Sequence, residues 1–287
     1  MNVVIEDNSE KRKKLRIFYI TIIAICIISI IVAFVMQIKK GNIFTSMGSI
    51  SRLPELTDEK ISVYKQQFNE MFENKVNYDF KSNAYKINKI EEGKEIVYLG
   101  YQSKENQVND YDLDVNIPYI NIKEETIENI NKEIKDVFEQ KAKDVLNTQN
   151  NNVIYTVNFN AYVSNNVLSL VVRSTLKEGG NPQRDIVQTY NYDLNKHKEY
   201  TVDDMLELKG ITKKDATQKI KDEIKIVQQR VEELGKLGYS VYTRDYTSDI
   251  YNINNVTEYF LGPDNALYII YAYGNLNHTS EMDIVVM

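Results

Sequence analysis

The positions of hydrophobic and polar residues divide the chain into segments of different kinds. One stretch is hydrophobic throughout, a short stretch after it has no sustained period, and the remainder alternates between helical and strand periods. We therefore predict a tail (1–16), a transmembrane helix (17–38), a linker (39–56) and two α+β subdomains (57–150 and 151–287).

Three segments have hydrophobic residues at helical spacing. A helix capped by Thr57 gathers Ile61, Tyr64, Phe68, Met71 and Phe72 on one side. The segment 126–146 is the clearest helix, with Ile127, Ile130, Ile134, Val137, Phe138 and Val145 on one face. A third helix opens at Thr212 and Asp215, ends near Gly235, and has Ala216, Ile220, Ile224, Val227, Val231 and Leu234 on its hydrophobic face.

Alternating patterns predict strands in much of the remaining chain. The clearest is 153–163, joined by a Ser-Asn-Asn turn to 167–176, with a third strand at 186–194. Further strands are expected at 85–101, 108–122, 199–202, 256–261, 266–273 and 282–286. The predicted fold class is α+β, an antiparallel sheet covered by two long amphipathic helices and preceded by one N-terminal transmembrane helix.

Residues 17–38 have the length and composition of a membrane span. The segment contains 22 residues without a charge, about 33 Å as a helix, which matches the hydrocarbon core of a bilayer. A cleaved signal peptide is disfavoured, because the hydrophobic stretch is long and no A-x-A site follows it. A lipoprotein signal is also disfavoured, since Ile25 rather than Gly or Ala precedes Cys26.

The flanking charges predict the orientation. Five Lys or Arg residues lie in the first 16 positions and three in 39–58, which favours a cytoplasmic N-terminus and an extracellular C-terminal part of a single-pass cell-membrane protein. The single cysteine, Cys26, falls within the span, so the outer part has no disulfide, as in many Gram-positive bacteria. The net charge of −6 argues against nucleic acid as a partner.

Short motifs suggest little chemistry. Asp110, Asp112 and Asp114 resemble the start of a calcium loop, but Val115 and Asn121 stand where an EF-hand needs Gly and Glu, so a strand is favoured. Ser62 and Lys65 match an S-x-x-K motif without any K-T-G. His197 and His278 fall in predicted loops. We therefore expect no catalytic residues, no bound metal and no cofactor.

Two exposed regions are candidates for ligand binding. The loop 177–185 joins two predicted strands and carries charged and hydrogen-bonding groups, among which Arg184 is expected to be exposed. The second region is an expected exposed edge near the C-terminus. The candidate residues are Glu178, Gly179, Gly180, Asn181 and Arg184 in the loop, and Tyr271, Tyr273 and Asn275 at the edge. An ordinary solvated loop and structural tyrosines remain the alternatives.

Several segments from about residue 85 onward are similar to a known family. They are VNIPYINI (115–122), the helix with INKEI (130–134), LSLVVRSTL (168–176) before Gly179 and Gly180, TYNYDLNKHKEYTVDDML (189–206) and YFLGPDNALYIIYAYG (259–274). This order resembles the paired extracytoplasmic domains of the anti-sigma-V factor that serves as a lysozyme receptor, and of some peptidoglycan deacetylases. Asn181 and Pro182 stand where the family has Ala-His. The resemblance implies the outer module without a deacetylase domain or a long sigma-binding tail.

These observations predict a membrane-anchored extracytoplasmic binding or sensory module at a Gram-positive-type cell envelope. The expected ligand is an extracellular protein, such as lysozyme, or a cell-wall glycan. One alternative is an anti-sigma-factor-like signalling protein acting through the short basic tail. Another is a cell-wall hydrolase that uses scattered carboxylates.

Overall fold

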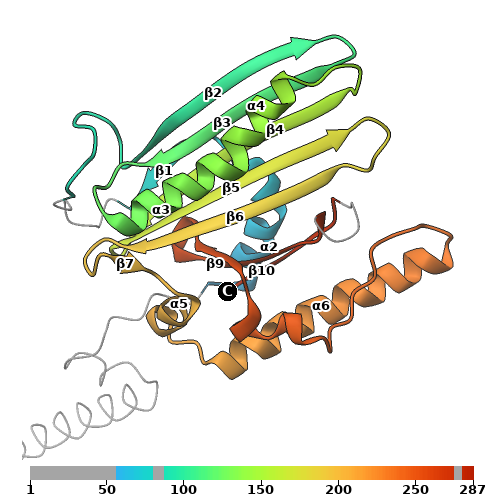
Figure 1. Ribbon diagram of the computed structural model, residues 1–287. Coiled ribbons are helices and arrows are strands. Elements are labelled where there is room, and N and C mark those ends of the chain that lie inside the picture. Colours follow the sequence, from blue (N-terminus) through green and yellow to red (C-terminus); the bar gives the residue numbers. More distant parts are fainter. Residues whose placement is uncertain (1–55, 80–86, 275–279) are drawn as a thin grey trace, which may run out of the picture. The chain divides into compact units, whose positions relative to one another are not determined.

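The computed structural model describes residues 56–79, 87–274 and 280–287, which belong to one compact unit, Leu53–Met287 (Figure 1). Within these ranges, no helix is both long enough and apolar enough to cross a membrane. The predicted span 17–38 lies outside the described residues.

A large mixed sheet forms the centre of the fold. Its strand order is β2-β3-β4-β5-β6-β7, and β1 pairs with β4. The strands are β1 (Lys75–Tyr78), β2 (Val97–Gln107), β3 (Tyr111–Ile120), β4 (Val153–Ser164), β5 (Val167–Glu178), β6 (Arg184–Asp193) and β7 (Lys198–Glu199). Strands from 57–150 and from 151–287 therefore pair within one sheet.

The α+β class is confirmed, and the large sheet is mostly antiparallel as predicted, but two of its strand pairings are parallel. Strand β4 runs parallel to β3 over Val153–Val157 and parallel to β1 further along, at Asn160–Val163. The physical reason is the connection between β3 and β4, which crosses over through a helix and so returns the chain in the same direction. Strand β1 was not predicted, and residues 87–96 of the predicted strand 85–101 precede the start of β2.

The first face of the large sheet is covered by one long helical segment. It consists of α3 (Glu125–Ile134), a π-helical turn η2 (Lys135–Glu139) and α4 (Gln140–Leu146), and it lies across the sheet in Figure 1. The predicted helix 126–146 is confirmed, with Ile127, Ile134 and Phe138 fully buried. Val137, predicted on the buried face, is 37% exposed, because a π turn contains an extra residue and shifts the helical register.

A small antiparallel sheet packs on the second face, with strand order β10-β9-β8. The strands are β8 (Glu258–Leu261), β9 (Leu267–Ala272) and β10 (Met282–Val286), and β8 contacts β5 and β6. The helix α2 (Asp58–Gln67) is followed by the short turn η1 (Phe68–Glu70). Phe68 belongs to the hydrophobic cluster that lies between the two sheets. The predicted strands near the C-terminus are confirmed.

The second long helix, α6 (Lys213–Lys236), belongs to the small sheet and not to the large one. Its buried residues Ala216, Ile220 and Ile224 pack with residues of β8, β9 and β10, in a cluster that also contains the short helix α5 (Val202–Lys209) and the turns η3 (Asp249–Tyr251) and η4 (Ile253–Asn255). Thr212 caps it as predicted, accepting from the Asp215 backbone N–H at 3.1 Å. The helix continues past the predicted cap Gly235, and Gly238 has the left-handed φ of +88°.

Candidate functional site

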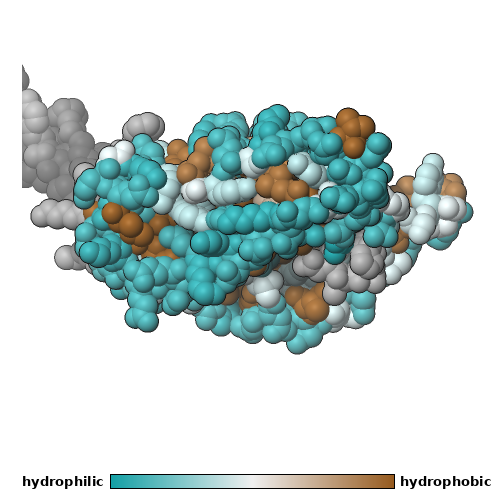
Figure 2. Space-filling view, turned by 45° about the horizontal axis from the view of Figure 1, so that its top comes forward, coloured by the Kyte–Doolittle hydropathy of each residue, from teal (hydrophilic) through white to brown (hydrophobic). Residues whose placement is uncertain are grey.

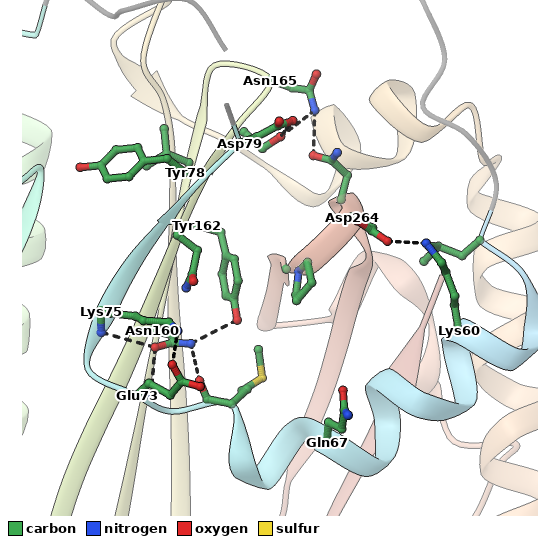
Figure 3. A pocket seen from close by; sticks show the side chains of 18 of the residues that line it. Lys60, Gln67, Glu73, Lys75, Tyr78, Asp79, Asn160, Tyr162, Asn165 and Asp264 are labelled. Carbon is green, nitrogen blue, oxygen red and sulfur yellow. Dashed lines mark hydrogen bonds and ion pairs between the residues drawn. The ribbon is translucent and has the colours of Figure 1, made fainter. Parts of the chain in front are cut away.

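A polar groove of about 1110 Å³ lies where α2, β1 and two tight turns meet (Figure 3). One turn joins β4 to β5. The other, η5 (Pro263–Asn265), joins β8 to β9. The residues that line the groove are Leu56, Thr57, Lys60, Gln67, Glu70, Met71, Glu73, Lys75, Asn77, Tyr78, Asp79, Asn160, Tyr162, Val163, Ser164, Asn165, Gly262, Pro263, Asp264 and Asn265.

Two side chains of β4 form the floor of the groove. Asn160 is 2% exposed, and its Oδ1 accepts from the backbone N–H of Glu73 at 3.1 Å, which holds the segment between α2 and β1 in place. Its Nδ2 donates to Tyr162 Oη at 3.3 Å. Burial raises the pKa of Tyr162 to about 12, so the hydroxyl stays protonated at neutral pH. Figure 3 shows Tyr162 pointing into the groove.

Asp264 connects one wall of the groove to the opposite helix. It lies in the turn η5 with a left-handed φ of 52°, a conformation that Asp and Asn tolerate well. Its carboxylate accepts from Lys60 Nζ at 2.5 Å and from Tyr64 Oη at 2.8 Å. Burial, and then the bond to Asp264, raise the pKa of Tyr64 to about 12. The phenol therefore stays a donor, and the α2 wall is fixed to the turn.

The two turns also bond to each other. Asn165 Nδ2 donates to Asn265 Oδ1 at 2.7 Å, across a hundred residues of sequence, and to Ser164 Oγ at 3.0 Å. Both asparagines have left-handed backbones, with φ of 50° and 56°. The end of the groove is therefore made of short polar turns rather than long loops.

The charges and surfaces of the groove suit a polar ligand that is not an anion. The lining includes four carboxylates, Glu70, Glu73, Asp79 and Asp264, against the two ammonium groups of Lys60 and Lys75. Amide and hydroxyl groups contribute most of the other polar atoms.

In the view of Figure 2, hydrophobic side chains form small separate groups within a hydrophilic surface, so that face offers no broad apolar interface.

The predicted loop residues lie between β5 and β6, at the end of β5 that is remote from the groove. Glu178 accepts from Lys141 Nζ at 2.8 Å and from Arg184 at 2.9 Å, and the Asn181 N–H donates to the Glu178 carbonyl. The Arg184 side chain is only 23% exposed, so the expectation of full exposure is wrong. The reason is that β5 and β6 extend two residues further than predicted, so that Arg184 pairs with Leu176 and its side chain reaches Glu178, two residues further along β5. Gly179 has a left-handed φ of 55°, and Gly180 has open space around it.

The predicted exposed edge is instead covered, with Tyr273 buried and Tyr271 partly buried. Tyr273 is 3% exposed, and its hydroxyl donates to Asp283 at 2.9 Å and lies 2.7 Å from the Tyr251 hydroxyl. Tyr271 packs edge-on against Tyr251 in the α6 cluster. The segment before η3 covers this edge, since Arg244 bonds to Asp283 at 2.8 Å and lies over the ring of Tyr273. Asn275 lies outside the described residues.

The groove was not predicted from the sequence, although the Ser-Asn-Asn turn and the two strands on either side of the second turn, 256–261 and 266–273, were. Nothing in the pattern of hydrophobic and polar residues indicates that Asn165 and Asn265 meet. The strand β1, which forms one wall of the groove, was not predicted. A signal existed in the left-handed residue types of the two turns, since Asn-Asn and Asp-Asn pairs at strand ends indicate tight turns rather than long loops.

A hydrolase would require a pair of carboxyl groups facing a cleft. Glu258 on β8 is partly buried, and burial raises its pKa to about 7. The carboxyl group that acts on it, Glu133 of α3, is exposed. Neither residue lines the groove. Among the described residues, no group of three His, Cys, Asp or Glu side chains is placed to hold a metal ion.

The fold and the groove define an α+β domain of two packed sheets with a polar groove at one end. Comparison with known proteins adds little. No protein-family model and no curated protein matches the chain. A DUF3298 family protein from Pseudomonas aeruginosa has a TM-score of 0.35 and 10% identity, over 63% of this chain and 83% of its own. A DUF3298 member from Bacteroides fragilis has a TM-score of 0.31 and 14% identity, over 61% and 81%. Likenesses this weak support no functional statement.

Proposed function

We propose that the protein is a single-pass, membrane-anchored binding or sensory module at the cell envelope, and that the groove holds its ligand. The hydrophobic stretch 17–38 supports the anchoring, and the distribution of Lys and Arg around it supports an extracellular location for residues 39–287. The observation that carries the binding role is the groove, whose polar groups come from α2, β1, β4 and two turns.

The ligand that best fits is a cell-wall glycan. Hydroxyl-rich chains form hydrogen bonds with amide, carboxylate and phenol groups, and the lining supplies Gln67, Asn77, the exposed Tyr78 and several carboxylates. An anionic ligand would be repelled by the excess of carboxylates over ammonium groups.

Binding is tested with the full-length chain in lipid nanodiscs and a soluble N-acetylglucosamine oligosaccharide as the probe. Gln67→Ala removes a side chain that lines the groove, and we expect a loss of about 0.5–1.5 kcal/mol, as for a neutral hydrogen bond. Gln66→Ala is the matched control, because Gln66 is exposed on the same helix outside the groove. Equal affinities of the two variants would exclude the groove, and binding of lysozyme instead of the oligosaccharide would identify a protein ligand.

The anchoring has a separate test. Protease added to intact protoplasts is expected to degrade residues 39–287 and to spare the tail and the span. Complete protection would reverse the orientation and remove the envelope from the proposal.

A further inference from the structure

The two sheets are joined by hydrogen bonds between side chains of the large sheet and the backbone of β8. The Tyr259 N–H donates to Thr189 Oγ1 at 3.0 Å, and the Tyr259 carbonyl accepts from Asn191 Nδ2 at 2.7 Å. The Leu261 N–H donates to Ser169 Oγ at 3.1 Å. We call this set the seam: Ser169, Thr189 and Asn191 of the large sheet, with Glu258, Tyr259 and Leu261 of β8.

Glu258 differs from the other members of the seam because it can carry a charge. Its Oε2 accepts from the backbone N–H of Thr189 at 2.7 Å and from Thr189 Oγ1 at 3.1 Å. On this side of β6 the neighbouring strand β7 pairs only with Tyr192 and Asp193. The carboxyl group therefore takes the place of a strand partner for Thr189, at the point where the two sheets meet.

We propose that Glu258 makes the docking of the two sheets proton-linked: the seam holds its neutral carboxyl group more tightly than its carboxylate. A proton on Oε1 leaves Oε2 able to accept both hydrogen bonds from Thr189. The neutral form thus keeps the contacts of the seam while losing the penalty for a buried charge.

The surroundings of Glu258 favour the neutral form. The group lies between β6 and β8, and the residue opposite it on β9 is the buried Ile270. From α3 the charged group acting on it is Glu133, which is also negative. The flanking phenols Tyr190 and Tyr259 stay neutral, because burial raises the pKa of each. Burial, and to a smaller extent Glu133, raise the pKa of Glu258 from 4.5 to about 7, against the opposing bonds from Thr189.

The sign of the effect follows from this direction. The pKa is raised in the folded state, so the stabilisation is fully present below the unfolded value of 4.5 and is lost as the pH rises through about 7. The unfolding equilibrium constant should therefore increase about thirtyfold between pH 5.5 and 8.5 through this one group.

The test compares the full-length chain with Glu258→Gln, which keeps the size and the acceptor oxygen but cannot ionise. Denaturant unfolding at pH 5.5 and 8.5 is expected to show the increase of about thirtyfold in the parent and little of it in Glu258→Gln. The control Glu133→Gln removes the exposed neighbouring charge and should keep most of the pH dependence. Parallel pH profiles for the parent and Glu258→Gln would overturn the proposal.

A second measurement does not depend on a variant that folds. The side-chain carboxyl carbon of Glu258, followed by NMR in the parent chain, should titrate near neutral pH, and the exchange protection of the Thr189 and Tyr259 amides should fall as it ionises. A titration midpoint near the ordinary value of a glutamate would contradict the proposal even if the Gln variant failed to fold.

Discussion

The second face of the large sheet has two halves that differ in what covers them. In the covered half, Tyr162, Val171 and Val187 pack against Phe260, Tyr268 and Phe68. In the open half, Asp114, Thr156 and Thr175 lie in register across β3, β4 and β5 and are partly exposed. The first face is hydrophobic along both halves, so the difference arises only from the second set of alternating positions.

Polar residues occur in both halves but have different partners. In the open half they bond to one another across strands, as Lys104 does with Asp114 at 2.6 Å and Gln102 with Asn116 at 2.8 Å. In the covered half, Ser169 and Asn191 are buried and bond to each other and to β8. A polar residue at an alternating position therefore indicates either solvent or the backbone of another sheet.

The largest effect is expected in the hydrophobic part of the covered half. Phe260 is fully buried and stacks on Tyr268 with ring centroids 4.6 Å apart. Phe260→Ala should lower the free energy of unfolding by about 3–5 kcal/mol, because it leaves a cavity between the sheets. Denaturant unfolding measures this loss, and a loss below about 1 kcal/mol would mean that the small sheet does not cover this half.

A smaller effect is expected for the polar part of the covered half. Asn191→Ala removes the partners of the Ser169 hydroxyl and of the Tyr259 carbonyl, both within the seam. We expect a loss of about 1–3 kcal/mol, the cost of leaving buried polar groups unsatisfied. Asn116→Ala, in the open half, is the matched control and should cost clearly less. Equal losses would remove the distinction between the two halves.

The hairpin end that was predicted as a binding loop should show a modest stability effect. Arg184→Ala breaks a half-buried ion pair with Glu178, and a loss of about 0.5–1 kcal/mol is expected at pH 7. Lys141 first, and then Arg184, lower the pKa of Glu178. The stabilisation is therefore present at neutral pH and is lost as the pH falls through the lowered pKa, so the variant and parent should converge in acid. A constant difference at all pH values would assign the loss to packing.

The smallest effect is expected in the open half. Thr156 lies between Asp114 and Thr175 on the partly exposed face, and Thr156→Val should change the free energy of unfolding by no more than about 0.5 kcal/mol. The same unfolding measurement provides the check. A large stabilisation would indicate that this half is covered by another surface in solution.

Local patterns in the sequence predicted most elements correctly, because each depends on residues close together in the chain. The strands at β4, β5, β6, β8, β9 and β10 and the helices α2, α3–α4 and α6 follow from periods of two and of 3.6 residues. The cap at Thr212 depends on only four residues. The four-residue strand β1 was not predicted, and its length does not explain this, since β8 is equally short.

Which of these elements pair or pack with one another depends on the tertiary structure alone. The parallel pairing of β4 depends on a crossover, and the groove depends on turns a hundred residues apart. The burial of Tyr273 depends on Arg244, which lies far from it in the sequence, and on Asp283, which lies on another strand. Sequence periodicity determines which side of an element is hydrophobic, whereas only packing determines whether a polar side faces water, another sheet or a ligand, since a hydrogen bond can be satisfied by any of the three.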